Sequence, residues 1–144
     1  MKTIFILDES TDRQNQMNHY LTAMGFQVQS LSAVEFDNVS QKPLAIILDE
    51  KFRSVEKNGG LLLLKKIARK MSGVPVVFMK EGVDDTTMAE AKKSGAYEVI
   101  EKNSAEFVNL RTALDKIVND PPKSGWFARL FGKKQTPGMP ALSV

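Results

Sequence analysis

The sequence predicts an α/β fold in which short parallel strands alternate with helices, and three observations support this prediction. Apolar runs of strand length recur along the chain, the most continuous being Ile4–Leu7, Leu44–Leu48 and Val74–Met79. Segments with apolar residues at helical spacing lie between these runs. Strands that lack polar alternation are typical of parallel sheets covered by helices on both faces. We therefore expect five β–α units joined by right-handed connections.

The first half of the chain contains three of the predicted strands. The first strand is followed by a capping box at residues 11–14, which predicts the start of a helix that Gly25 ends. The stretch Phe26–Leu31 alternates apolar and polar residues, as an outer strand does. Residues 33–41 have the pattern of a short, weak helix, and the second fully apolar strand follows it.

The second half of the chain repeats the alternation. A polar loop over residues 50–58 precedes a helix that extends from Gly59 to about Met71. After the third apolar strand, residues 85–94 form a helix with few inward-facing apolar positions. Tyr97–Ile100 is the final short strand, and residues 103–106 have the pattern of a cap for the last helix.

Composition limits the class of protein. The 144 residues are 42% hydrophobic and 26% charged, which predicts one domain with a substantial core. The absence of cysteine excludes a disulfide framework and thiolate chemistry. No stretch approaches the ~20 apolar residues of a membrane span. The N-terminus lacks the layout of a secretion signal, so we expect a cytoplasmic protein.

A tail is expected to follow the domain. Asp120 and two prolines end the last helix, so we predict a domain over residues 1–119 and a tail over residues 120–144. Residues 121–144 carry four positive charges and no acid, which leaves the rest of the chain with a net charge of −1. The basic character of the chain therefore comes from this tail.

The tail contains a basic and aromatic segment. Within a short helix expected at residues 124–132, one face would be formed by Trp126, Phe127, Leu130 and Phe131. This face would anchor the chain to an anionic membrane surface, to a groove on a partner protein, or to its own domain. The remainder of the tail, with its prolines and glycine, is predicted to be disordered.

Carboxylates follow two of the apolar strands. Asp8 and Glu9 come directly after the first strand, and Asp49 follows the strand that begins near residue 44. If these strands are neighbours in a parallel sheet, the three acids converge at its carboxyl edge, where open α/β sheets bind ligands. Three acids at one place need a counter-charge, which either a metal ion or a lysine would supply.

These acids belong to an ordered set of motifs. The set begins with the acidic pair Asp8 and Glu9, the acid Asp49 at the end of the third strand, and the turn Asn58-Gly59 with the helix Leu61–Ile67 after it. It continues with a proline and apolar strand at Pro75–Met79, the pair Gly95-Ala96 and a final lysine, Lys102. Residues 2 to about 119 thereby resemble the receiver domain of bacterial response regulators.

The resemblance implies a flavodoxin-like doubly wound parallel sheet of five β–α units with strand order 2-1-3-4-5. It also implies a role in two-component signalling. By this resemblance, Asp8, Glu9 and Asp49 of this chain would hold Mg²⁺, and Asp49 would accept a phosphoryl group from a histidine kinase. Lys102 would neutralise charge on the phosphoryl group, since phosphoryl transfer depends on positioning and charge neutralisation.

Several residues near the acceptor position depart from the family. Lys80 stands where the family has a serine or threonine at the end of the fourth strand, and Glu81 stands where it has a small residue. Val99 replaces the aromatic residue of the fifth strand that rotates on activation. Asn103 and Arg53 replace two family prolines.

These departures suggest a receiver fold closed by its own cations. Lys80 and Lys102 would neutralise two of the three acids, and each pair at ~4 Å has roughly 4 kcal/mol of Coulomb attraction before desolvation is subtracted. Two alternatives remain open. Lys80 could point into solvent and leave the acids free for Mg²⁺, or Asp49 could be retained without any chemistry.

We therefore expect a stand-alone, non-enzymatic signalling protein that docks onto a protein partner without normal aspartyl phosphorylation or a cofactor. The alternative is a Mg²⁺-dependent phospho-acceptor that a histidine kinase phosphorylates on Asp49. No helix-turn-helix output domain is visible in the sequence, so nucleic-acid binding is not expected. Peripheral contact with the inner membrane surface through the tail is compatible with either function.

Overall fold

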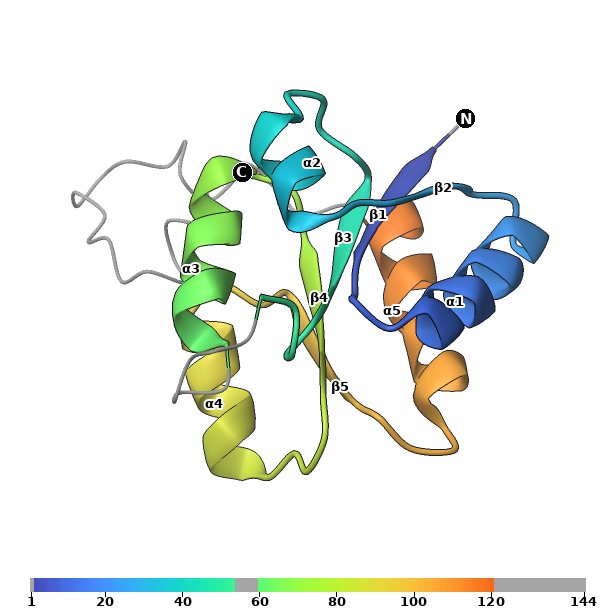
Figure 1. The fold of residues 1–144 in the computed structure, drawn as a ribbon. Helices are drawn as coiled ribbons and strands as arrows, with labels where there is room; N and C mark the ends of the chain where they lie inside the picture. The colour runs from blue at the N-terminus through green and yellow to red at the C-terminus, as the bar shows by residue number, and fades with distance from the viewer. Residues whose placement is uncertain (1, 54–59, 121–144) are drawn as a thin grey trace, which may run out of the picture.

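The computed structural model describes residues 2–53 and 60–120, in which strands and helices alternate without exception (Figure 1). The strands are β1 (Thr3–Leu7), β2 (Gln27–Ser30), β3 (Ala45–Asp49), β4 (Val76–Lys80) and β5 (Glu98–Glu101). The helices are α1 (Thr11–Ala23), α2 (Ala33–Asn38), α3 (Leu61–Lys70), α4 (Asp85–Lys93) and α5 (Glu106–Asn119). The predicted tail anchor, Trp126, Phe127, Leu130 and Phe131, lies outside the described residues.

The five strands form one parallel sheet in the order β2-β1-β3-β4-β5, which confirms the predicted fold class and strand order. The two acidic strand ends are neighbours, because β1 pairs with β3 in a register that places Leu7 opposite Leu48. The carboxyl ends of β1 and β3 therefore lie side by side at one edge of the sheet, as the sequence predicted.

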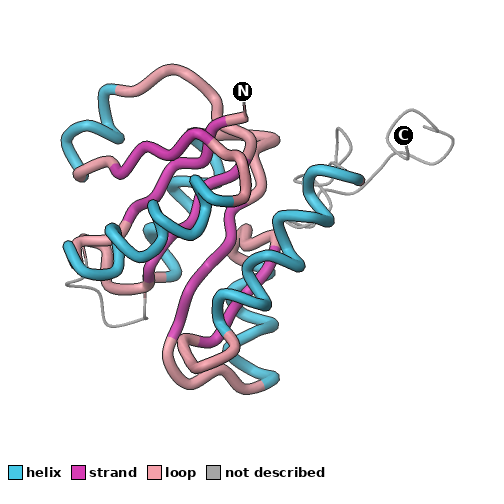
Figure 2. Tube along the Cα trace, turned by 90° about the vertical axis from the view of Figure 1, so that its right-hand side faces the viewer, coloured by secondary structure: helices cyan, strands magenta, loops and turns pink. Residues whose placement is uncertain are grey.

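Helices cover both faces of the sheet (Figures 1 and 2). On one face, α2, α3 and α4 bury an apolar cluster that includes Phe5, Phe78 and Leu64. On the other face, α1 and α5 bury a second cluster that includes Ile6 and Leu114. Alternate strand residues supply the two clusters, because successive side chains of a strand point to opposite faces. This two-sided burial explains why the strands are apolar throughout.

The helix boundaries differ in detail from those expected. The N-cap of α1 is Ser10, whose hydroxyl accepts a hydrogen bond from the Arg13 amide at 3.3 Å, so the capping box predicted at residues 11–14 is wrong by one residue. Asp84 and Thr87 form an unpredicted capping box at the start of α4. This pair compensates for the weak apolar face of that helix, because it satisfies amides that the first helical turn leaves unpaired.

Gly60 determines how the chain enters α3. Its φ of +82° lies in the left-handed region, and a Cβ at this position would lie 3.0 Å from the Glu50 carbonyl oxygen. A glycine is therefore required there both by conformation and by space. In the part of the chain that the structure describes, no helix has the length and apolar composition needed to cross a lipid bilayer.

Candidate functional site

Two buried carboxylates lie at the carboxyl edge of the sheet. Asp8 follows β1 and Asp49 ends β3, and each is only 5% exposed. Asp8 Oδ1 accepts a hydrogen bond from the Ser10 amide at 2.9 Å, and Asp49 Oδ2 accepts one from the Lys51 amide at 3.0 Å. These bonds fix the carboxylates through the turns that follow the two strands.

Lys102 is the first cation of the site. It follows β5, and its Nζ lies 2.5 Å from Asp49 Oδ1, with side-chain exposures of only 9% and 6% for the two residues. The contact is an ion pair, and Oδ1 has no hydrogen-bond partner among the described residues. Lys102 therefore lies beside Asp49, where the sequence analysis placed it.

The second cation is Arg13, in the first turn of α1, which the sequence analysis missed. Its Nε lies 3.1 Å from Asp8 Oδ2 and 4.0 Å from Asp49 Oδ1, and its Nη2 donates to Glu106 Oε2 at 2.9 Å. Glu106 is the first residue of α5 and is itself buried. The guanidinium therefore lies among three acids that come from β1, β3 and α5.

Lys80 is not part of this cluster, contrary to expectation. Its Nζ pairs with Glu50 Oε1 at 3.2 Å, and Glu50 Oε2 accepts a hydrogen bond from the Glu81 amide at 2.8 Å. The register explains the difference. Asp49 lies opposite Met79, so Glu50 is the residue beside Lys80, and strand alternation directs the Asp49 and Glu50 side chains to opposite faces.

Glu9 is not buried with Asp8 and Asp49, although the sequence analysis grouped the three acids. It is exposed, and its Oε2 accepts a hydrogen bond from the Arg53 amide at 3.2 Å. Glu81 faces solvent, where it pairs with Lys51 at 3.6 Å. Val99 is buried in the cluster beneath α3 and α4, so the position of the expected aromatic switch contributes to the core.

Burial and pairing have opposite effects on the pKa values of the site, and burial is the stronger at Asp8 whereas pairing prevails at Arg13. Burial raises the pKa of Asp8 above its ordinary value, with a further increase from the Asp49 charge. The Ser10 amide and the Arg13 guanidinium oppose this shift without cancelling it. Conversely, the hydrogen bond and the charge of Glu106 raise the pKa of Arg13 despite its partial burial. The guanidinium is thus the permanent charge of the site.

The arrangement does not fit the Mg²⁺ ion that the family resemblance implied. Three oxygen atoms of Asp8 and Asp49 have bonding partners, and the remaining one, Asp49 Oδ1, faces two cations. Among residues 2–53 and 60–120, no three acidic, histidine or cysteine side chains are grouped as a metal site would require. Arg13 and Lys102 supply the counter-charge that the acids need.

Two signals in the sequence pointed to the missed residues. Arg13 lies five residues after Asp8, in the first turn of the helix that follows it, within reach of that acid. Lys80 could have been assigned to Glu50 from strand pairing and alternation alone. No local signal indicated Glu106, which is 93 residues from Arg13 in sequence.

The fold is that of known receiver domains. A two-component response regulator from Clostridium difficile superposes with a TM-score of 0.70 at 21% identity, over 85% of this chain and 100% of that chain. A response regulator from Thermotoga maritima gives a TM-score of 0.68 at 22% identity, over 83% and 98% of the two chains.

A response regulator receiver protein from Pseudoalteromonas atlantica gives a TM-score of 0.67 at 22% identity, over 81% of this chain and 97% of that chain. The chain has the receiver fold. No family model matches the sequence, and no curated protein matches it. These likenesses concern the fold, so the function is argued from the site.

Proposed function

We propose that this chain is a receiver-like docking module of a signalling pathway, closed at its carboxylate edge by its own cations. It acts by binding a protein partner, without enzymatic activity and without normal aspartyl phosphorylation. The position of Arg13 among Asp8, Asp49 and Glu106 is the observation that carries this proposal.

The charges of the site argue against a phosphoryl acceptor. Transfer to Asp49 would require a carboxylate oxygen that is free to attack, and both oxygens already face hydrogen-bond or ion-pair partners. Cations would also be required around the incoming phosphoryl group. Arg13 and Lys102 are already engaged by three acids, and Lys80 is engaged by Glu50.

The expected response to phosphorylation is also missing. A hydroxyl at the end of β4 would have to follow the phosphoryl group, and Lys80 and Glu81 occupy this place. The residue expected to rotate, Val99, is buried and apolar. In this proposal the protein partner binds α4, β5 and α5, and the tail attaches the chain to that partner or to the inner membrane surface in the cytoplasm.

Phosphodonor chemistry tests the proposal. The full chain is incubated with acetyl phosphate and Mg²⁺, and its intact mass is recorded beside that of a conventional receiver domain. We expect the conventional domain to gain a phosphoryl group and this chain to remain unmodified. An acid-labile adduct on this chain that disappears in Asp49→Asn would overturn the proposal.

One observation favours a second function, a Mg²⁺-dependent phospho-acceptor that a histidine kinase modifies. Asp49 Oδ1 accepts no hydrogen bond from the described residues, and Lys102 is placed where it would neutralise a phosphoryl group. This function requires Arg13 to leave the acids when Mg²⁺ arrives. Titration with Mg²⁺, followed by amide chemical shifts of Asp8, Asp49 and Arg13, distinguishes the two: saturable shifts support the acceptor, and unchanged spectra support the closed module.

A further inference from the structure

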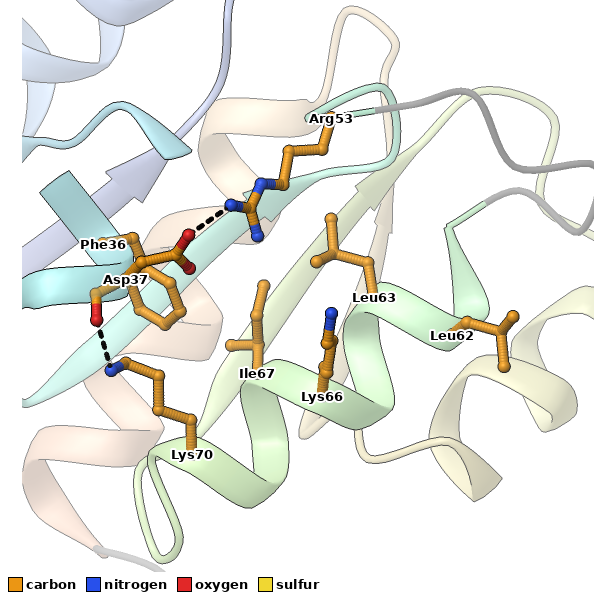
Figure 3. A pocket seen from close by; sticks show the side chains of 8 residues that line it. All are labelled: Phe36, Asp37, Arg53, Leu62, Leu63, Lys66, Ile67 and Lys70. Carbon is orange, nitrogen blue, oxygen red and sulfur yellow. Dashed lines mark hydrogen bonds and ion pairs between the residues drawn. The ribbon is translucent and has the colours of Figure 1, made fainter. Parts of the chain in front are cut away.

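A groove lies between α2 and α3 (Figure 3). Its volume is about 860 Å³, within the range of cavities that bind several side chains or a small ligand. Phe36 of α2 and Leu63 and Ile67 of α3 form its apolar floor. A groove with an apolar floor indicates a binding surface when the residues around it define what it would bind.

The rim of the groove is cationic. Arg53, Lys66 and Lys70 surround the floor, and Asp37 is the one acid among the described residues that line it. Figure 3 shows that Asp37 is already engaged: its carboxylate pairs with Arg53 at 2.5 Å, and its carbonyl oxygen accepts a hydrogen bond from Lys70 at 3.2 Å.

Lys66 is the cation of the rim whose charge is not paired with an acid of the described residues. It is exposed at the centre of the rim, and within the described residues it has neither an ion pair nor a hydrogen bond from its side chain. Helix α3 is basic as a whole, because its ten residues include four basic side chains and no acid. A helix with an apolar face over a groove and an exposed, unpaired lysine beside it provides both halves of a recognition surface.

We infer that this groove binds an acidic amphipathic segment of a partner protein, whose apolar side chains enter over Phe36, Leu63 and Ile67 and whose carboxylates pair with Lys66 and the neighbouring cations. The inference rests on the proposed docking function but not on the state of Asp49. It adds a second docking surface on the opposite face of the sheet from α1 and α5.

Charge selects this occupant over the alternatives. The chain's own tail, residues 121–144, carries four positive charges and no acid, so like charges would oppose its entry. A second copy of the chain would bring the same basic α3 to a symmetric contact. An anionic membrane would satisfy the lysines but would leave the recessed apolar floor uncovered, because the floor residues are buried.

Selection from a displayed peptide library tests both the charge and the apolar character of the occupant. Random 12-residue peptides are selected on the immobilised full chain, and the consensus peptide is synthesised. We expect Asp and Glu to be enriched together with Leu or aromatic residues at helical spacing. In the peptide titration, we also expect methyl shifts of Leu63 and Ile67. No enrichment, a basic or neutral consensus, or shifts confined to other surfaces would overturn the inference.

A pair of variants on one helix provides the control. Lys66→Glu should weaken binding of the consensus peptide about tenfold by reversing a charge at the rim. Lys65→Glu makes the same change on the same exposed helix outside the groove, and should alter affinity less than threefold. Equal losses in both variants would indicate non-specific attraction and would overturn the site.

Two further outcomes would assign the groove to another occupant and reject this one. A homodimer in light scattering that Lys66→Glu alone dissociates would assign it to a second copy. Binding to phosphatidylserine vesicles that Lys66→Glu alone abolishes, without peptide binding, would assign it to a lipid surface. Because the phosphodonor assay reports on Asp49 and the peptide selection reports on the groove, failure of this inference is separable from failure of the closed-edge proposal.

Discussion

The carboxylate edge and α3 both concentrate cations, but the cations differ in what balances them. At the edge, Arg13 and Lys102 are mostly buried and lie against Asp8, Asp49 and Glu106. On α3, four exposed basic residues occur without an acid in the helix, and Lys66 among them has no ion pair or side-chain hydrogen bond within the described residues. Charge that is balanced within the chain contributes to folding, whereas charge left unbalanced at the surface is available to a partner. Loss of a cation should therefore be costly at the edge and nearly free on α3.

The largest effect is expected at Lys102. Lys102→Met retains most of the side-chain length but removes the charge beside Asp49, and should lower the free energy of unfolding by about 3 kcal/mol, because it leaves a buried carboxylate without its close partner. Lys92→Met is the matched control. Its pair with Glu98 is more exposed, at 42% and 30%, so its loss should be below about 1 kcal/mol. Equal urea midpoints for the two variants would contradict the role of Lys102.

The loss of Arg13 should have the second largest effect on stability. Arg13 contacts more acids than Lys102 does, but its greater exposure weakens each contact. Arg13→Gln should lower the free energy of unfolding by about 2 kcal/mol. Arg111→Gln removes an exposed pair with Asp115 at 4.0 Å and should change it by less than about 0.5 kcal/mol. If the edge needs a cation of any kind, Mg²⁺ should raise the urea midpoint of Arg13→Gln but leave the wild type unchanged. Mg²⁺ stabilisation of the wild type would argue against the closed edge.

The contacts of Arg13 could not be predicted from the sequence, in contrast to those of the strand ends. The sheet order and the place of Lys102 beside Asp49 could be predicted from the resemblance to receiver domains, and the meeting of Asp8 and Asp49 also from the ends of neighbouring parallel strands. The contact of Arg13 with Glu106 depends on how α1 and α5 pack against the sheet, which no short-range pattern encodes. The assignment of Lys80 was wrong for a different reason, since the register with Glu50 was accessible in principle but was not used.

The pH dependence of folding stability shows whether burial or pairing has the larger effect on the pKa of Asp8. Its pKa is raised in the folded state, so the folded chain holds this proton more tightly than the unfolded chain does. The contribution of Asp8 to stability is therefore greatest below the ordinary carboxyl pKa, and it is lost as the pH rises through the raised value. Across this window the stability of the wild type should fall relative to Asp8→Asn, by less than the effect at Arg13. Urea unfolding of both proteins at several pH values measures this, and the opposite slope would mean that pairing outweighs burial.

The pairs beside the edge should be weaker. Lys80 and Glu50 have side-chain exposures of 21% and 11%, so Lys80→Met should cost about 1 kcal/mol. Lys51 and Glu81 have exposures of 65% and 63%, so Lys51→Met should be nearly neutral. Thermal melts of both variants test the ranking. A larger cost for Lys51 would show that exposure does not control the strength of these pairs.

The smallest change in the free energy of unfolding is expected on α3, where removal of a cation should stabilise the fold. Lys66 and Lys70 are four residues apart, so they are like-charged neighbours on the helix surface. Lys66→Gln should therefore raise the free energy of unfolding by about 0.3 kcal/mol at low ionic strength, and the gain should disappear in high salt as the repulsion is screened. Paired urea titrations at two salt concentrations measure it. A clear loss of stability would mean that Lys66 has a role in folding, and the contrast between the two cation groups would fail. A small gain combined with weaker peptide binding would mean that this lysine is retained at a cost to stability because a partner uses it.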